Sequence, residues 1–200
     1  MSRIRSLRPN VSREQAIAHF SPRGISGAIP PLLLGRLRSV AEFYIPFRIF
    51  RLNVANRGRA EQKILAIDSV TGALMPYVFR APPALEQIVE VETRNYVVSR
   101  LPERDAIRIA ETRCQRILFA SGFFRIRELK ITSEFLTEIH IPYWIAFRGN
   151  GDVARLSVLD ALRRRTEGAK IRLIVRNWLI SGANSGAEHH SVSALAATRF

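Results

Sequence analysis

The sequence predicts an α+β fold made of two related units, each a helix followed by a long strand and a hairpin, with antiparallel sheet covered by helices. Three observations support this. The 200 residues are 47% hydrophobic and 24% charged, which is a globular composition. Long apolar runs with a period of two predict strands, and helical patterns precede them. Short matches also recur along the chain in the same order.

The repeat is clearest in the predicted strands. Residues 40–49 (VAEFYIPFRI) align with 136–145 (LTEIHIPYWI) at an offset of 96 and share a glutamate, an Ile-Pro pair and the last isoleucine. Residues 64–70 align with 156–162 at an offset of 92, and residues 13–17 with 103–107 at an offset of 90. Because the order is kept and the offset changes only in expected loops, we predict an internal duplication.

The predicted units are residues 1–80 and 101–180. A linker at 81–100 begins with Ala-Pro-Pro, and a tail at 181–200 is rich in Ser, Ala and Gly and is expected to be disordered. The strands of the two units either share one sheet or form two neighbouring sheets, and the sequence leaves both arrangements open.

Each unit opens with a helix. Ser12 and Gln15 have the spacing of a capping box, and this first helix is expected to end near Phe20. The second helix is expected to start at Pro102 and to bury an apolar face made of Ile107, Ala110, Cys114, Ile117 and Leu118. A C-terminal helix over 168–180 is expected to bury Ile171, Ile174, Val175 and Trp178.

A long strand follows each helix. In the second unit one face carries Phe135, Thr137, Ile139, Ile141, Tyr143, Ile145 and Phe147; in the first it carries Ala41, Phe43, Ile45, Phe47 and Ile49. Because proline lacks a ladder donor, we expect Pro46 and Pro142 at a bend, a bulge or an edge. Turns at 56–58 and 149–152 lead to partner strands at 61–68 and 154–160. Asp68 and Asp160 end these strands ahead of further turns, where we expect each carboxylate to cap local N–H groups.

The charge points to an acidic partner. Lys and Arg number 31 against 17 Asp and Glu, so the net charge is +14, with the excess in residues 1–60 and 151–200. We expect an acidic macromolecule, protein or nucleic acid, with the oligomeric state left open. The start has no apolar signal region and no apolar run is long enough to span a membrane, so we expect a cytoplasmic protein without membrane contact. The single cysteine, Cys114, excludes an intramolecular disulfide.

One segment resembles a known family. Residues 65–72, LAIDSVTG, resemble the closing strand of PepSY-type domains, small helix-plus-antiparallel-sheet modules in which an Asp-x-x-Thr-Gly turn often follows the last strand. The Arg-Glu-Gln-Ala-Ile start of the first helix is similar too. The resemblance implies a PepSY-like module, in tandem, with an inhibitory or interaction role. The second copy departs from it, with Arg163-Arg164-Arg165 inserted before Thr166-Glu167-Gly168.

Three groups of residues are candidates for function. Glu138, His140, Tyr143 and Trp144 lie close together in sequence and could line a ligand site. The arginines Arg36, Arg38, Arg163, Arg164, Arg165 and Arg172 could neutralise phosphates. Glu42 and Glu138 occupy equivalent repeat positions and could form a carboxylate pair.

The sequence favours a non-catalytic binding or regulatory module that recognises a macromolecular partner. No nucleophile-elbow, Walker, dinucleotide-binding or zinc-protease motif occurs, so we expect no cofactor and no metal. The alternative is a nucleic-acid or phosphate-binding protein that uses its arginine-rich ends. A third hypothesis is a hydrolytic enzyme that uses Glu42, Glu138 or His140.

Overall fold

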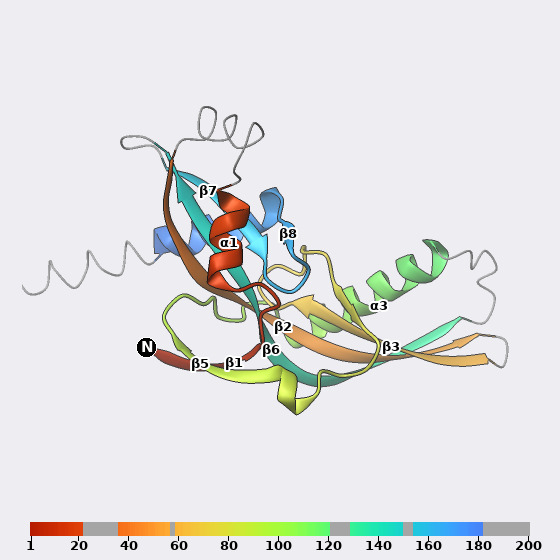
Figure 1. The fold of residues 1–200 in the computed structure, drawn as a ribbon. Helices are drawn as coiled ribbons and strands as arrows, with labels where there is room; N and C mark the ends of the chain where they lie inside the picture. The colour runs from red at the N-terminus through yellow and green to blue at the C-terminus, as the bar shows by residue number, and fades with distance from the viewer. Residues whose placement is uncertain (22–35, 57–58, 121–128, 150–153, 182–200) are drawn as a thin grey trace, which may run out of the picture.

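The fold is α+β, as predicted. The computed structural model describes residues 1–21, 36–56, 59–120, 129–149 and 154–181 (Figure 1). One eight-stranded sheet has the main order β4-β3-β2-β6-β1-β5, with β7 paired to β6 and β8 to β7. The strands are β1 (Ser2–Leu7), β2 (Leu37–Asn56), β3 (Arg59–Asp68), β4 (Tyr77–Phe79), β5 (Ile88–Thr93), β6 (Lys130–Arg148), β7 (Arg155–Asp160) and β8 (Arg165–Thr166). Strands from both predicted units therefore lie in a single sheet.

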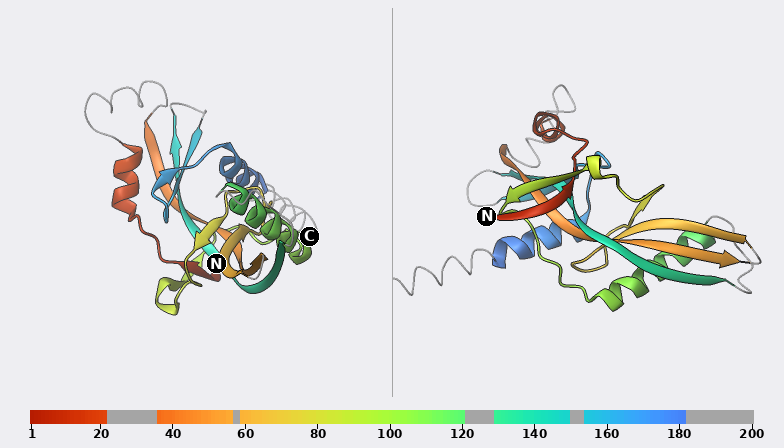
Figure 2. Two further views of the ribbon diagram at one scale, coloured as in Figure 1. Left: turned by 90° about the vertical axis from the view of Figure 1, so that its right-hand side faces the viewer. Right: turned by 90° about the horizontal axis from the view of Figure 1, so that it is seen from below.

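The two long strands form the centre of the sheet. β2 and β6 pair antiparallel over most of their length, with Ile45 opposite Ile141 near the middle, and Figure 2 shows that both curve strongly. The predicted hairpins are confirmed: β3 pairs with the second half of β2, and β7 with the second half of β6. Each hairpin therefore extends from an opposite end of the central pair.

The two prolines lie neither at a sheet edge nor at a bulge, two of the three positions expected for them. Pro46 and Pro142 lie inside the central strands, away from both sheet edges and from the register shifts. The carbonyl of Pro46 accepts a hydrogen bond from the N–H of Ser69, and that of Pro142 from the N–H of Ala161. Two residues before Pro46, the N–H of Tyr44 donates to the Asn95 carbonyl, and the Tyr44 carbonyl accepts from the N–H of Val97. Pro46 therefore stands where β2 changes partner, so its missing N–H breaks no ladder bond.

A bulge alters the predicted face of β6. In the ladder Ile49 lies opposite Thr137, and the next residue, Phe50, lies opposite Phe135, so Leu136 has no partner in β2. Phe135 was expected on the same face as Ile139 and Ile141, but the bulge places it on the other face. Its ring packs edge-to-face against Phe50, with centroids 6.0 Å apart, and it is 41% exposed.

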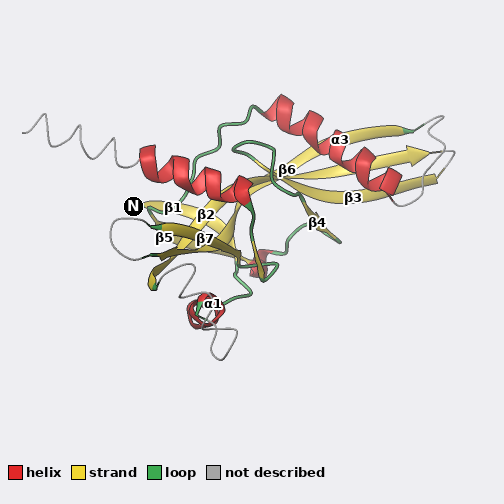
Figure 3. Ribbon diagram, turned by 90° about the horizontal axis from the view of Figure 1, so that it is seen from above, coloured by secondary structure: helices red, strands yellow, loops and turns green. Residues whose placement is uncertain are grey.

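Three described helices cover the sheet. Both predicted helices of the units are confirmed, as α1 (Arg13–Phe20) with its Ser12–Gln15 capping box and α3 (Glu103–Ala120). The predicted C-terminal helix is confirmed at 169–181, with Ile171, Ile174 and Val175 in the main core. In Figure 3, α3 lies along the β2–β3 half of the sheet and α1 beside the β7 half. Each half of the central pair thus has its own helix.

Three apolar clusters result from this packing. The largest joins one face of β2 and β6 to Tyr77 and the helix 169–181, and its central members include Phe43, Phe47 and Ile141. The second packs Ala106, Ala110, Cys114 and Leu118 of α3 against the other face of β2 and β3. The third packs Ala16 and Phe20 of α1 against Trp144 and Leu159. The long strands are therefore buried on both faces.

The segment 81–100, expected as a linker, contributes to the sheet. It contains the 3-10 turn η1 (Leu85–Gln87) and β5, which pairs with β1 over six residues from Ser2–Thr93 to Leu7–Ile88. β1 itself was not predicted. The expected disordered tail at 181–200 lies, apart from Ser181, outside the described residues.

Candidate functional site

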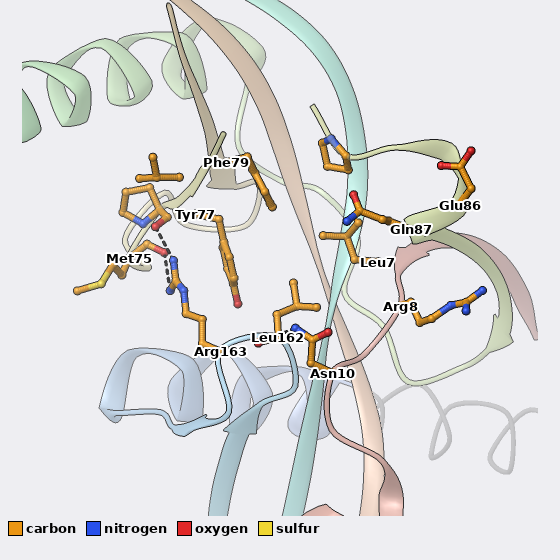
Figure 4. Close-up of a pocket in the computed structure, with 13 residues that line it drawn as sticks. Leu7, Arg8, Asn10, Met75, Tyr77, Phe79, Glu86, Gln87, Leu162 and Arg163 are labelled. Carbon is orange, nitrogen blue, oxygen red and sulfur yellow. Dashed lines mark hydrogen bonds between the residues drawn. The ribbon is translucent and has the colours of Figure 1, made fainter. Parts of the chain in front are cut away.

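A pocket of about 790 Å³ opens between the edge strand β4 and the chain that leads from β1 into α1 (Figure 4). This volume is within the range of roughly 300–1,000 Å³ that is typical of ligand sites. Its lining comes from four segments: Leu7, Arg8 and Asn10; Met75, Pro76, Tyr77, Val78 and Phe79; Pro83, Glu86 and Gln87; and Leu162 and Arg163. The pocket is therefore assembled from both predicted units and from the segment between them.

Tyr77 fixes the β4 wall to the core. Its hydroxyl donates a hydrogen bond to Asp160 Oδ2 and lies 3.4 Å from the Tyr143 hydroxyl. Burial, together with the neighbouring Tyr143 and Asp160, raises the pKa of Tyr77 far above its usual value. The phenol therefore stays protonated at physiological pH, and it acts here as a hydrogen-bond donor rather than as a base.

Asp160 shapes the turn on the other side of the pocket. It is fully buried, and its Oδ1 accepts the backbone N–H groups of Leu162 and Arg163, both at 2.8 Å. Asp68 caps the turn after β3 in the same way, through Val70 and Thr71. The expectation that both aspartates cap turns is confirmed. In the second turn, this capping holds Leu162 and Arg163 against the pocket.

Arg163 joins that turn to the start of β4. Its Nη2 donates to the Pro76 carbonyl at 2.6 Å and its Nη1 to the Met75 carbonyl at 3.5 Å, as the dashed lines in Figure 4 show. The guanidinium carbon also lies 3.6 Å from the centroid of the Tyr77 ring, a cation–π contact. Arg163 is thus a structural part of the pocket wall.

The opposite wall is held by backbone and amide bonds. The Arg8 N–H donates to the Gln87 carbonyl at 2.8 Å, and Asn10 Nδ2 donates to the Leu162 carbonyl at 2.9 Å. In Figure 4, Leu7 and Gln87 face the rings of Tyr77 and Phe79 across the pocket, while the Arg8 side chain points outward. The interior is therefore an apolar and aromatic slot with amide groups at one side.

The rim of the pocket exposes large apolar side chains. Met75, a lining residue, is 60% exposed, and Leu85, which lies between the lining residues Pro83 and Glu86 in sequence, is 79% exposed. Exposed apolar side chains gathered at a concave site are typical of a binding surface. This rim and the slot below it form the candidate site.

Two of the predicted ligand residues lie away from this pocket, on β6. Glu138 accepts hydrogen bonds from Arg48 Nε at 3.1 Å and Ser99 Oγ at 2.6 Å. His140 Nδ1 lies 3.2 Å from the Arg5 carbonyl, and burial lowers the pKa of His140, opposed by that carbonyl and by Glu138. Both side chains are therefore held by bonds within the protein.

Tyr143 and Trp144 point to opposite faces of the sheet. Tyr143 lies in the main core behind Tyr77, and Trp144 packs below α1 and donates from Nε1 to the Val11 carbonyl at 2.9 Å. Successive residues of a strand alternate between faces, so the four predicted residues do not converge on one cavity. Only Tyr143 supports the pocket, through Tyr77.

The predicted carboxylate pair is not formed. In the central ladder Glu42 lies opposite Trp144 and Glu138 opposite Arg48. The two glutamates are therefore six residues apart along β2, about 20 Å at the rise of a strand. Glu42 instead accepts a hydrogen bond from the Tyr44 hydroxyl at 2.7 Å. This arrangement gives no acid–base pair for hydrolysis.

The predicted arginines are divided among several places. Arg36 and Arg38 are exposed at the start of β2, and Arg38 Nε donates to the Gly149 carbonyl at 3.0 Å. Arg172 is exposed on the helix 169–181. Arg164 donates to the Asn10 carbonyl at 2.8 Å, and Arg165 pairs with Glu167 at 3.1 Å. With Arg163 bound to Pro76, all three members of the arginine run are engaged within the chain.

No family model matches the chain, and no curated protein or solved structure matches it. Within the described ranges, no three His, Cys, Asp or Glu side chains come together as a metal site. No described helix is long and apolar enough to cross a membrane.

Most of the pocket residues were missed by the sequence analysis. Of the predicted site residues only Arg163 lines it, whereas Leu7, Tyr77, Phe79 and Gln87 carry no recognisable motif. The one available signal was the short aromatic run Tyr77-Val78-Phe79 between Pro76 and Pro82, which resembles an edge strand. That signal gives no information on what lies opposite it.

Proposed function

We propose that the protein is a non-catalytic binding module that recognises an acidic protein partner, and that the pocket beside β4 is its recognition site. The observation that carries the proposal is a slot of about 790 Å³ in which the rings of Tyr77 and Phe79 lie opposite Leu7 and Gln87, with the 60% exposed Met75 among its lining residues. Burying one leucine- or phenylalanine-sized side chain there would contribute about 1.5–3 kcal/mol to binding.

The charges around the pocket favour an acidic partner. Three basic side chains gather at the 73–76 end: Arg163 on Met75 and Pro76, Arg165 with its Nη2 3.7 Å from Met75 Sδ, and Lys170 with its Nζ 3.1 Å from the Ala73 carbonyl. Arg8 is exposed on the opposite wall. The nearby acidic residues are Glu86, the buried Asp160, which is bonded to Tyr77 and to its own turn, and Glu167, which is paired with Arg165. Together with the net charge of +14, these groups would steer an acidic surface toward the slot.

We also propose that the chain arose by duplication, so that its two units are related. Three kinds of contact support this, because each recurs with the offsets of 90, 92 and 96 found in the sequence. In the first kind, Ser69 N–H donates to the Pro46 carbonyl, and Ala161 N–H donates to the Pro142 carbonyl. In the second, Asn10 N–H donates to the Ala161 carbonyl, and Arg100 N–H donates to the Ser69 carbonyl. In the third, Ser6 lies opposite His140, and Tyr96 lies opposite Tyr44. The units differ after their hairpins, where the first has β4 and the second has the arginine turn.

These two unlike segments meet at the pocket, which supports the view that the units diverged to create it. The resemblance of residues 65–72 to PepSY-type modules favours binding in the same way. The nucleic-acid alternative has less support, because its arginines do not gather on one surface: Arg36 and Arg38 lie at the start of β2 and Arg172 on the helix 169–181, and none of these three lines the pocket. The hydrolytic hypothesis has the least support, because Glu42 and Glu138 lie far apart.

Selection from a phage-displayed library of random dodecapeptides tests the proposal. We expect enriched peptides with an apolar residue flanked by acidic ones. Met75→Glu places a carboxylate on a 60% exposed lining position beside Arg165 and should weaken these peptides at least about tenfold, equal to about 1.4 kcal/mol. The control Val98→Glu, at a 54% exposed position that does not line the pocket, should bind as the wild type does. Equal enrichment on Met75→Glu, or preference for an oligonucleotide, contradicts the proposal.

A further inference from the structure

We infer, on the basis of the proposed binding function, that the pocket takes an extended peptide segment that adds a strand to the free edge of β4. The argument depends on the position of β4 in the sheet, on its difference from the other edge strand, and on the path of the pocket. Nothing in it requires the ends of the partner chain, so an internal segment of a partner is a suitable ligand.

β4 is one of the two terminal strands of the main sheet path. One side of β4 pairs with β3, with Tyr77 opposite Ala66 and Phe79 opposite Ile64, and no described strand pairs with its other side. An unpaired edge offers backbone N–H and C=O groups to another chain. Peptide-binding modules that work by strand addition use such an edge for affinity and a neighbouring pocket for specificity.

The two ends of the main sheet path are protected very differently. β5, at the other end, carries the exposed charges Glu90 and Glu92, and Glu90 pairs with Arg3. Charged side chains on an edge strand discourage pairing with another chain. β4 has the uncharged sequence Tyr-Val-Phe and is limited only by its length, with Pro76 before it and Pro82 after it. The open edge is therefore the one beside the pocket.

The pocket runs along this edge. The rings of Tyr77 and Phe79 line it on one side, and Leu7 and Gln87 face them from the other, as Figure 4 shows, whereas the side chain of Val78 lies on the opposite face of the sheet. A strand placed in this slot would alternate its side chains, so one apolar residue would enter beside Phe79 and Leu162. Acidic residues toward the Met75 end would lie near Arg165 and Lys170. The ligand is thus an extended acidic peptide with one apolar anchor.

Because β4 is only three residues long, few backbone bonds can form, and each should matter. The test uses a pocket-dependent dodecapeptide from the library and variants of it, each N-methylated at one backbone nitrogen. N-methylation at the alternate positions that face β4 should weaken binding about tenfold per lost bond, whereas methylation between them should have little effect. The peptide should also slow amide hydrogen exchange at Val78 or Phe79, with β5 unchanged.

Uniform tolerance of N-methylation, together with unchanged exchange in β4, would overturn strand addition. If the same peptide is still lost on Met75→Glu, the binding function survives and only the mode of recognition is wrong. If no peptide depends on Met75, both the function and the mode are contradicted.

Discussion

Replacing Tyr77 by phenylalanine removes one hydroxyl and leaves the ring that lines the pocket. In the native chain this hydroxyl donates to the buried Asp160 carboxylate, whose remaining bonds come from the N–H groups of Leu162 and Arg163. A hydrogen bond to a charged group contributes about 1.5–3 kcal/mol, and Asp160 would stay buried with one oxygen unpaired. We therefore expect Tyr77→Phe to lower the free energy of unfolding by about 2–3 kcal/mol.

Thermal unfolding followed by circular dichroism at neutral pH measures this effect. For a chain of this length, 1 kcal/mol corresponds to about 2–4 °C, so Tm should fall by about 4–12 °C. Tyr96→Phe is the matched control, because its hydroxyl donates at 2.9 Å to the neutral, half-buried Ser2 Oγ. That change should cost about 0.5–1.5 kcal/mol. A loss for Tyr77→Phe no larger than for Tyr96→Phe would refute the role given to the Tyr77–Asp160 bond.

Three further predictions concern the fold. Because burial lowers the pKa of His140 in the folded chain, the contribution of this residue to stability should be complete above about pH 6.5 and be lost as pH falls toward the folded pKa. In urea unfolding, the free energy of unfolding of His140→Gln should therefore decline less between about pH 7 and 5 than that of the wild type. An equal decline would contradict this. Gly72→Ala should cost about 2–4 kcal/mol, because φ is +67° and the new Cβ would lie 2.4 Å from Ile109 Cδ1, whereas Gly168→Ala, with no atom within 4 Å, should be nearly neutral in the same assay. Fragments 1–100 and 101–200 should fold only when combined, because β2 pairs with β6 across the cut and Asn10 bonds to Ala161, and cooperative unfolding of either fragment alone would contradict this.

Local signals in the sequence were enough to predict the central elements. β2, β3, β6 and β7 have long period-2 runs and glycine-containing turns, and α1 has a capping box. β1 was missed because Ser2–Leu7 alternates Ile4 with arginines and is stabilised by distant partners, β5 and His140. The place of Pro46 inside a central strand was not predicted for a related reason: where β2 changes partner depends on residues 95–97 and Ser69, which are not its neighbours in sequence.

The pocket could not be predicted, because it depends on contacts between segments more than eighty residues apart. Tyr77 and Asp160 lie in different units, and neither has a sequence context that points to the other. Glu138, His140, Tyr143 and Trp144 were grouped by proximity in sequence, but the alternation of a strand sends Tyr143 to the opposite face from the other three. Asp68 and Asp160, by contrast, were predicted correctly as turn caps, since capping requires only neighbouring N–H groups.

Hydrogen–deuterium exchange of the full chain, with and without a saturating selected peptide, tests most directly that the slot beside β4 is the recognition site. The account predicts slower exchange in residues 75–79, with smaller effects at 7–10, 85–87 and 162–163. Protection confined to β5, or to the exposed side of the helix 169–181, would contradict it.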